Sequence, residues 1–345
     1  MPRIAIVGLG LIGGSLGLAL KAAKLPNVEI VGYDKDSSAM SKARKMGAVD
    51  KTAWTLRSAV EEAGMLIIAT PVFAIRQVME EVGEVLRPDC VVTDTGSTKA
   101  AVIRWAYEIL PPPVSFVGGH PLAGKEKSGI EAAEATLFQE RPYCLIPAPA
   151  ASESAVRVVN GLISAVGARC VFVDAEEHDQ YVAAISHVPL ILSVALFTLV
   201  RDSASWPDMA NLASSGFRDF TRLTGSDPTM SHDICLTNRQ ALSHWLDRFT
   251  GELSQYRELL QEGHEGDLFQ RLTKAQMDRD SYISHSEAAP GPPGPEIPSL
   301  GDQLSSLFMG ERLAQRAKDI SKLLSGEIPR DKLERPPKRE PPPKR

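Results

Sequence analysis

A glycine-rich turn near the N-terminus constrains the fold of this chain more than any other feature. Gly8-Leu9-Gly10-Leu11-Ile12-Gly13 follows the β-branched run Arg3 to Val7 and opens a segment with helical periodicity. In this context the spacing predicts a strand, a tight turn and a helix that bind a dinucleotide. Gly8 permits the turn, Gly10 lets a pyrophosphate approach the backbone, and Gly13 packs the helix on the strand. The helix N-terminus then presents N–H groups to the phosphates.

An acidic residue stands where the ribose of that dinucleotide is expected. Asp34 ends the second β-like run and follows the third glycine by about 20 residues, the spacing expected for the acid that bonds the ribose 2′-hydroxyl. A carboxylate there repels a 2′-phosphate, so the sequence predicts NAD rather than NADP. Thr70-Pro71-Val72 follows the third strand and is expected to pack against the cofactor.

The first half of the chain alternates β-branched runs with amphipathic stretches, which predicts an α/β fold with a parallel sheet and crossover helices. We assign residues 1–173 to this Rossmann-like dinucleotide-binding domain. Two of its expected helices are Leu11 to Ala23 and Ile75 to Val85. The expected strands are Arg3 to Val7, Val28 to Tyr33, Met65 to Ala69, Cys90 to Thr93, Ser115 to Val117, Tyr143 to Ile146 and Cys170 to Val173.

Residues 174–285 lose the β-like runs and read as an all-α substrate and dimerisation domain. Its two clearest helical segments are Gln180 to Val200 and Asn238 to Glu262. Gln180 to Val200 is apolar on nearly all faces, yet it carries Ser186, His187 and Pro189, so we interpret it as a buried helix rather than a membrane span. Helices of a second subunit are a plausible cover, and we expect a homodimer.

Residues 286–345 form a Pro-rich C-terminal tail by composition. Five prolines fall between Ala289 and Pro298, Leu300 to Leu324 has the pattern of one amphipathic helix, and Arg330 to Arg345 is basic. The role of this tail is not indicated by its sequence.

Charge and cysteine usage exclude several classes of function. A net charge of −5 gives no general field for polyanions, so nucleic acid is not an expected partner. The four cysteines are widely spaced and show neither a CxxC motif nor a metal pattern, so we expect no disulfide framework and no metal site. His178-Asp179 and His232-Asp233 resemble metal pairs, but no further carboxylate cluster supports that use. We expect a cytoplasmic protein that acts on a small molecule.

Two side chains near the ends of the central strands are candidates for chemistry. Ligands of open α/β sheets bind outside the carboxyl ends of the strands. Ser97 follows the fourth strand, and His120, within Gly118-Gly119-His120-Pro121, follows the fifth. A histidine beside a nicotinamide suits general-base work near neutrality, because its ordinary pKa is about 6.5. We expect His120 to lie in a rigid exposed turn. Ser97 has two possible roles: it orients His120 or the substrate hydroxyl, or it caps the N-terminus of a helix.

At this point the chain resembles the prephenate and arogenate dehydrogenases, the TyrA enzymes of tyrosine biosynthesis. The resemblance covers roughly residues 1–280. It rests on five segments in order: GLGLIGGSLGLAL from Gly8, TDTGSTK from Thr93, VGGHPLAGKEKSG from Val117, SHVPLIL from Ser186, and SSGFRDFTRLTGSDPTM from Ser214.

The resemblance implies an oxidative decarboxylation that converts prephenate and NAD⁺ to 4-hydroxyphenylpyruvate, CO₂ and NADH. The family's catalytic histidine and its assisting serine fall on His120 and Ser97. Its second histidine, which helps hold the substrate's side chain, falls on His187, and its carboxylate-binding arginine falls on Arg222. An ionic network at the entrance of the site matches Glu126, Arg218 and Asp219. A bidentate guanidinium suits the dianion prephenate on physical grounds as well.

Three alternatives stay open at this stage. Arogenate, which carries an amine in place of the side-chain keto group, is a serious alternative substrate. A β-hydroxyacid dehydrogenase also joins a Rossmann domain to a helical one, but it relies on a second-domain lysine, and no lysine occurs between Ser128 and Thr273. A non-catalytic NAD-binding sensor would need no base beside the nicotinamide. The chain departs from several relatives at Ser231, where they carry an aromatic residue, and it shows no ACT regulatory module, so feedback by tyrosine is not indicated.

Overall fold

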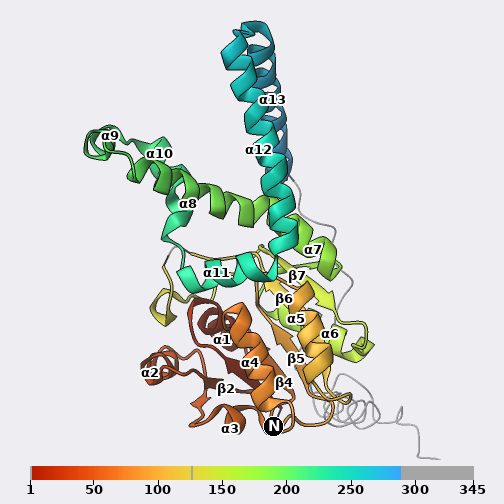
Figure 1. Ribbon diagram of the computed structural model, residues 1–345. Helices are drawn as coiled ribbons and strands as arrows, with labels where there is room; N and C mark the ends of the chain where they lie inside the picture. The colour runs from red at the N-terminus through yellow and green to blue at the C-terminus, as the bar shows by residue number, and fades with distance from the viewer. Residues whose placement is uncertain (1, 126, 289–345) are drawn as a thin grey trace, which may run out of the picture.

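The computed structural model describes residues 2–125 and 127–288, which form two stacked domains (Figure 1). An α/β domain carries an all-helical domain above the carboxyl ends of its strands. This arrangement confirms the predicted fold class. The Pro-rich tail, with the predicted helix Leu300 to Leu324, lies outside the described residues.

One eight-stranded sheet forms the centre of the α/β domain, in the order β3-β2-β1-β4-β5-β6-β7-β8. The strands β1 to β6 are parallel where they pair. β7 pairs with β6 in the antiparallel sense, and β8 is parallel to β7, so the prediction of a wholly parallel sheet is wrong at this edge. The strands are β1 (Arg3–Val7), β2 (Glu29–Tyr33), β3 (Lys51–Thr52), β4 (Met65–Ile68), β5 (Val91–Asp94), β6 (Ser115–Pro121), β7 (Pro142–Pro147) and β8 (Arg169–Phe172).

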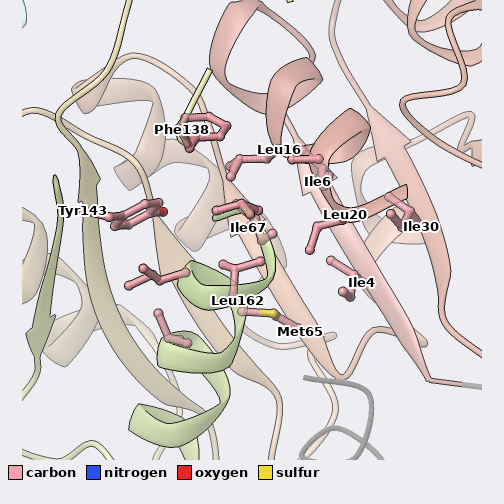
Figure 2. Packing of buried hydrophobic residues seen from close by; sticks show 14 of the residues in the cluster. Ile4, Ile6, Leu16, Leu20, Ile30, Met65, Ile67, Phe138, Tyr143 and Leu162 are labelled. Atoms are coloured by element: carbon pink, nitrogen blue, oxygen red, sulfur yellow. The ribbon is translucent and has the colours of Figure 1, made fainter. Parts of the chain in front are cut away.

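Both faces of the sheet are buried, because helices cover each of them. Along β1, Ile4 and Ile6 point into one hydrophobic core, whereas Ala5 and Val7 point into the other. Figure 2 shows the first core, in which Ile4 and Ile6 lie near side chains of α1 and α6. This explains why the strands read as near-continuous apolar runs rather than as alternating ones. The helices of this domain are α1 (Leu11–Ala22), α2 (Ser37–Lys45), α3 (Leu56–Val60), α4 (Val72–Val82), α5 (Ala100–Ile109), η1 (Ile130–Ala132) and α6 (Glu153–Ala165).

A long apolar helical run begins the second domain. It comprises α7 (Ala175–Val182), the π-helical segment η2 (Ala183–His187) and α8 (Val188–Arg201). Pro189 lies at the start of α8, directly after the π-helical segment, and it has no N–H to donate to the preceding turn of the run. The remaining elements are α9 (Trp206–Leu212), α10 (Ser215–Phe220), η3 (Arg222–Gly225), α11 (Pro228–Thr237), α12 (Arg239–Glu262) and α13 (Glu265–Ala288).

This apolar run is less buried than the sequence predicts. Within Ala175–Arg201, only 33% of the most apolar window is buried, and Ile185 and Leu199 are 72% and 74% exposed. By length and composition the run is also the one helix in the described part of the chain that could cross a membrane. One subunit leaves most of this run uncovered, and its cover by helices of a second subunit stays a prediction.

Candidate active site

The glycine-rich turn has the geometry that its spacing predicts. Gly8 has a φ of +92°, and a Cβ added there would lie 2.4 Å from the Ala69 carbonyl oxygen. A Cβ on Gly13 would lie 1.9 Å from the Gly8 carbonyl oxygen, so both positions exclude any side chain. Gly10, by contrast, faces open space, and no side chain caps the N-terminus of α1. The turn therefore leaves backbone and helix N–H groups accessible to an anionic ligand.

A pocket of about 240 Å³ adjoins this turn and suits one half of a dinucleotide rather than the whole. Asp34 lies at its edge: one carboxylate oxygen accepts the Leu9 N–H at 2.7 Å, and the other accepts the Asp36 N–H at 2.9 Å. Each oxygen keeps a lone pair for a further hydroxyl. The pocket is lined by Leu9, Gly10, Asp34, Asp36, Ala39, Lys42, Gly129, Ile130 and Glu131.

Of the three residues expected to contact the cofactor after β4, one is buried in the core and two are not. Thr70 lies beside the glycine turn, with its methyl group 3.0 Å from the position of a Cβ on Gly8. Pro71 is exposed at the start of α4. Val72, the first residue of α4, is 3% exposed and packs in the hydrophobic core, so its side chain stabilises the fold.

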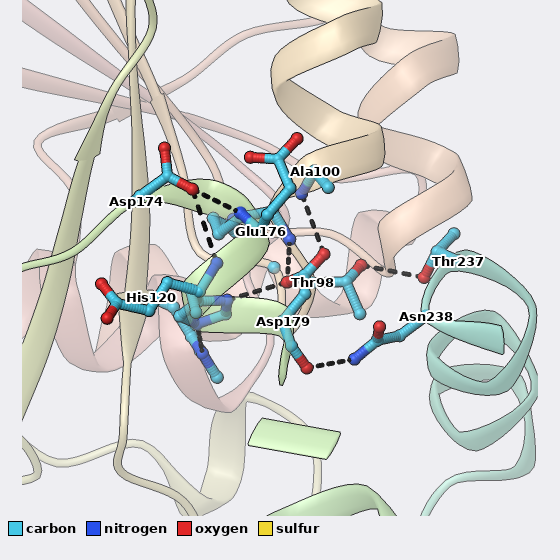
Figure 3. A network of polar contacts seen from close by, with 12 residues as sticks. Thr98, Ala100, His120, Asp174, Glu176, Asp179, Thr237 and Asn238 are labelled. Atoms are coloured by element: carbon cyan, nitrogen blue, oxygen red, sulfur yellow. Dashed lines mark hydrogen bonds and ion pairs between the residues drawn. The ribbon is translucent and has the colours of Figure 1, made fainter. Parts of the chain in front are cut away.

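His120 lies within a strand, not in an exposed turn after one. β6 continues past Val117 to Pro121 because β7 pairs with it, and His120 is the register partner of Cys144. The antiparallel β7 was not evident from the sequence, which explains the error. The His120 ring is only partly exposed. It meets His178 of α7, the first helix of the helical domain, in the polar network of Figure 3.

A buried polar network surrounds His120. Its Nδ1 lies 2.9 Å from His178 Nε2, and His178 Nδ1 lies 2.8 Å from Asp179 Oδ1. Lys99 contacts the backbone next to His120: its ammonium group forms an ion pair with Asp94 and donates to the Gly119 carbonyl at 2.8 Å. Lys99 and Asp94 are fully buried. The network thus fixes both the backbone and the ring of the candidate base.

Two aspartates of the helical domain cap helices of the α/β domain. Asp179 accepts the N–H groups of Lys99 and Ala100 at 2.7 and 2.9 Å, at the start of α5. Asp233 accepts the Phe73 N–H at 3.1 Å, in the first turn of α4. Neither helix has a side-chain cap from its own N-cap residue. Each carboxylate therefore satisfies donors across the domain boundary, which gives the two His-Asp pairs a structural use other than metal binding.

His187 presents a buried donor without a partner. Asn238 Nδ2 donates to the Asp179 carbonyl at 2.7 Å and lies 3.2 Å from His187 Nδ1, so Nδ1 is the acceptor and Nε2 carries the proton. His187 is 1% exposed, and its Nε2 has no hydrogen-bond partner in the structure. Buried donors in native proteins are nearly always paired, so this one is available to a ligand.

Burial keeps both imidazoles neutral. Burial is the first cause that holds the pKa of His120 well below its usual value, and the repulsion that a protonated His120 would meet from charge on His178, Lys99 or His187 adds to it. Burial likewise lowers the pKa of His187 to about 4, although Asp179 opposes this. A neutral His120 can accept a proton at physiological pH.

The depressed pKa of His187 predicts a loss of stability in acid. Below about pH 6.5 the unfolded chain binds a proton at this residue, whereas the folded protein does not until about pH 4. The free energy of unfolding should therefore fall with pH, by about 2 kcal/mol between pH 7 and pH 5 from this group alone. Urea unfolding of the wild type and His187→Gln at both pH values checks this. Equal pH dependence in the two proteins would contradict it.

The other predicted site residues are less closely associated. Ser97 is partly buried in the loop before α5, and it is not a helix N-cap, because Lys99 holds that position. The structure shows no hydrogen bond between Ser97 and His120. Arg218 and Asp219 are exposed on α10, which projects away from the α/β domain in Figure 1. Arg222 is exposed on η3, which packs against α8, and Glu126 lies outside the described residues.

Sequence reasoning missed several members of this site. Lys99 and Asn238 were not identified, and His178 and Asp179 were considered only as a metal pair. Their roles depend on contacts between segments about 60 to 80 residues apart, which no local pattern reveals. A weak signal was present in the His-Asp dipeptide, which lies a few residues after the last strand.

Fold and site together define a Rossmann-type dinucleotide-binding protein whose helical second domain closes over a neutral imidazole. Family models describe the same two parts. The nucleotide-binding domain of prephenate dehydrogenase matches residues 16–172, and its dimerization domain matches residues 174–274. The chain belongs to the prephenate dehydrogenase family.

Individual relatives agree with this assignment. Prephenate dehydrogenase of Bacillus subtilis is 33% identical over 90% of this chain and 86% of the relative. Cyclohexadienyl dehydrogenase of Zymomonas mobilis is 34% identical over 74% of this chain and 87% of the relative. Among solved structures, prephenate dehydrogenase of Aquifex aeolicus in complex with hydroxyphenyl propionate and NAD⁺ superimposes with a TM-score of 0.76. It is 29% identical, over 82% of this chain and 98% of that one.

Proposed function

We propose that this protein is an NAD-dependent prephenate dehydrogenase that converts prephenate to 4-hydroxyphenylpyruvate and CO₂ in tyrosine biosynthesis. The observation that carries the proposal is the neutral His120, near the carboxyl end of a strand in the same sheet as the dinucleotide-binding turn, in a chain of this family. The Aquifex relative binds NAD⁺ and a hydroxyphenyl compound together, which supports the same pairing of cofactor and substrate here.

The residues around the glycine turn fit NAD. The open backbone at Gly10 and the uncapped N-terminus of α1 suit a pyrophosphate, with the N–H groups of Leu11 and Ile12 in the first helical turn. Asp34 suits a ribose diol at the edge of the neighbouring pocket. We assign Thr70 and Pro71, which follow β4, to the lining of the cofactor site. When bound, the nicotinamide ring accepts a hydride from the substrate.

Asp34 predicts a preference of the enzyme for NAD⁺ over NADP⁺, which can be tested. Its carboxylate repels a 2′-phosphate, so kcat/KM with NAD⁺ should exceed that with NADP⁺ by at least about tenfold, as one charge repulsion at close range provides. In Asp34→Ser the preference should shrink, chiefly through KM for NADP⁺. Steady-state rates with both cofactors measure this, and equal efficiency in the wild type would contradict it.

The chain's own residues account for the proton transfer and for substrate binding. His120 accepts the proton of the ring hydroxyl as hydride leaves the carbon that carries this hydroxyl. Loss of the ring carboxylate as CO₂ then makes the ring aromatic, and the proton returns from His120 to the phenolate oxygen. We assign the orientation of the hydroxyl to Ser97, which lies in the loop between β5 and α5. The unpartnered Nε2–H of His187 suits an oxygen of the substrate's side chain. We assign a substrate carboxylate to Arg222, and the entrance of the site to Glu126, Arg218 and Asp219.

We further propose that the protein is a homodimer formed through its helical domain. The apolar run Ala175–Arg201 is largely uncovered in one subunit, and the matched family model is a dimerization domain. Large apolar side chains on α12 and α13 are also exposed, Leu260 and Phe269 among them. A second copy covers such a surface better than water does. Light scattering at micromolar concentration should give twice the mass of one chain, and a monomer mass would contradict the proposal.

Arogenate is the second candidate substrate. The match to a cyclohexadienyl dehydrogenase favours tolerance of both side chains. The two substrates share the ring whose hydroxyl proton we assign to His120, and they differ only in the side chain that we assign to His187. Steady-state rates with prephenate and arogenate, each with NAD⁺ and NADP⁺, test the whole assignment. Absence of NADH with either substrate would favour a non-catalytic sensor.

A further inference from the structure

A chain of hydrogen bonds joins the candidate base to a carboxylate of the other domain. His120 lies on β6, whereas its partner His178 and the carboxylate of Asp179 come from α7 (Figure 3). The two imidazole rings meet edge to face, with an interplanar angle of 74°. His178 and Asp179 are 2% and 4% exposed, so solvent does not compete for these hydrogen bonds.

We propose that His178 and Asp179 are positioning residues that fix the tautomer of His120, so that its Nε2 is the nitrogen that takes the substrate's proton. The proposal rests on the proposed function for the identity of the proton donor. The hydrogen-bond order itself follows from the structure alone.

The direction of each hydrogen bond follows from Asp179. Its two oxygens already accept the N–H groups of Lys99 and Ala100 at the start of α5, so both oxygens act as acceptors. His178 must therefore donate its Nδ1–H to Asp179, and its Nε2 is left as an acceptor. His120 in turn donates its Nδ1–H to that nitrogen. The remaining nitrogen of His120, Nε2, carries the free lone pair.

This arrangement also stabilises the product of proton transfer. When the hydroxyl O–H bond breaks, the proton goes to Nε2 of His120, and the imidazolium keeps its Nδ1–H bond to His178. The carboxylate of Asp179 lies at the far end of this chain of hydrogen bonds and holds the His178 ring in place. The other charged or titratable groups near the ring are Lys99, which is paired with Asp94, and His187 on η2. Neither of these replaces the acceptor at Nδ1.

A nitrogen-15 NMR measurement on histidine-labelled enzyme tests the proposal without substrate. The chain has only seven histidines, and the spectra of His120→Asn and His178→Leu assign the two rings. At neutral pH the wild type should show His120 protonated at Nδ1 and bare at Nε2. In His178→Leu this preference should be lost. A wild-type His120 protonated at Nε2 would overturn the proposal, whatever the enzyme's substrate proves to be.

Kinetics of two variants give the second readout. In His178→Leu, kcat should fall by about 10- to 100-fold while KM stays within about threefold, because only the orientation of the base changes. In His178→Gln the amide oxygen reaches the place of Nε2 and accepts the same N–H, so kcat should recover most of this loss. Equal loss in the two variants, or an unchanged kcat in His178→Leu, would contradict a positioning role. If His178→Leu does not fold, the wild-type tautomer and the Gln variant decide the question.

A failure of the positioning role of His178 and Asp179 is distinguishable from a failure of the proposed function. If the wild type does not oxidise prephenate, the proposed function is wrong, yet the tautomer of His120 still tests the positioning role. If prephenate is oxidised and His120 carries its proton at Nε2, the proposed function holds and the positioning role is wrong.

Discussion

The variant His120→Asn should lose kcat by about 10² to 10⁴-fold, with KM for prephenate within a few fold of the wild type. Asparagine keeps a polar group near the position of Nδ1, but it has no nitrogen that can accept a proton. Because the base acts in the transition state, its removal should leave ground-state binding of substrate largely intact. Initial rates of NADH formation across a range of prephenate concentrations measure both constants.

His264→Asn is the matched control for this change. His264 is an exposed histidine between α12 and α13, far along the chain from the site. Its variant should keep the wild-type kcat. If His120→Asn also kept it, His120 would not be the base, and the role of the network around it would have to be purely structural.

The variant Arg222→Ala should chiefly weaken substrate binding, by about 2 to 4 kcal/mol, which corresponds to a rise in KM of about 30- to 1,000-fold. A guanidinium that grips a carboxylate through two hydrogen bonds contributes to ground state and transition state alike. Its loss therefore raises KM more than it lowers kcat. The same steady-state measurement, extended to high prephenate concentration, separates the two constants.

Arg201→Ala serves as the control for charge. Arg201 is exposed at the end of α8 in the same domain, so its removal changes the net charge equally. Its KM should stay near the wild-type value. A wild-type KM in Arg222→Ala would mean that the substrate carboxylate is bound by another cation.

The cofactor half of the site could be predicted from the sequence because its constraints are local. Gly8 and Gly13 leave no room for a side chain, and Asp34 ends the strand next to β1 in the sheet. These residues act through their own backbone conformation or through an adjacent strand. Spacing in the sequence is then sufficient to place them.

The half of the candidate site around His120 could be predicted only in part, because its geometry depends on distant segments. The sequence indicates His120 as a candidate base, but its place within β6 depends on β7, whose antiparallel course has no local signal. The partners of His120 come from α7, and α7 in turn caps α5 through Asp179. A residue whose role is to satisfy a helix N-terminus in another domain looks like an ordinary aspartate in the sequence.

The apolar run Ala175–Arg201 shows the same limitation at the level of assembly. Its composition predicts burial, yet one subunit leaves most of it uncovered. Hydrophobicity along a helix indicates that a cover exists, but not whether the cover comes from the same chain.

The most direct test of the central claim is the stoichiometry of one reaction, measured on the purified wild-type protein with prephenate and NAD⁺. We predict one NADH and one 4-hydroxyphenylpyruvate for each prephenate consumed, and neither product at a comparable rate in His120→Asn. Prephenate that remains unchanged while NAD⁺ is bound, or NADH formed equally well without His120, would contradict the claim.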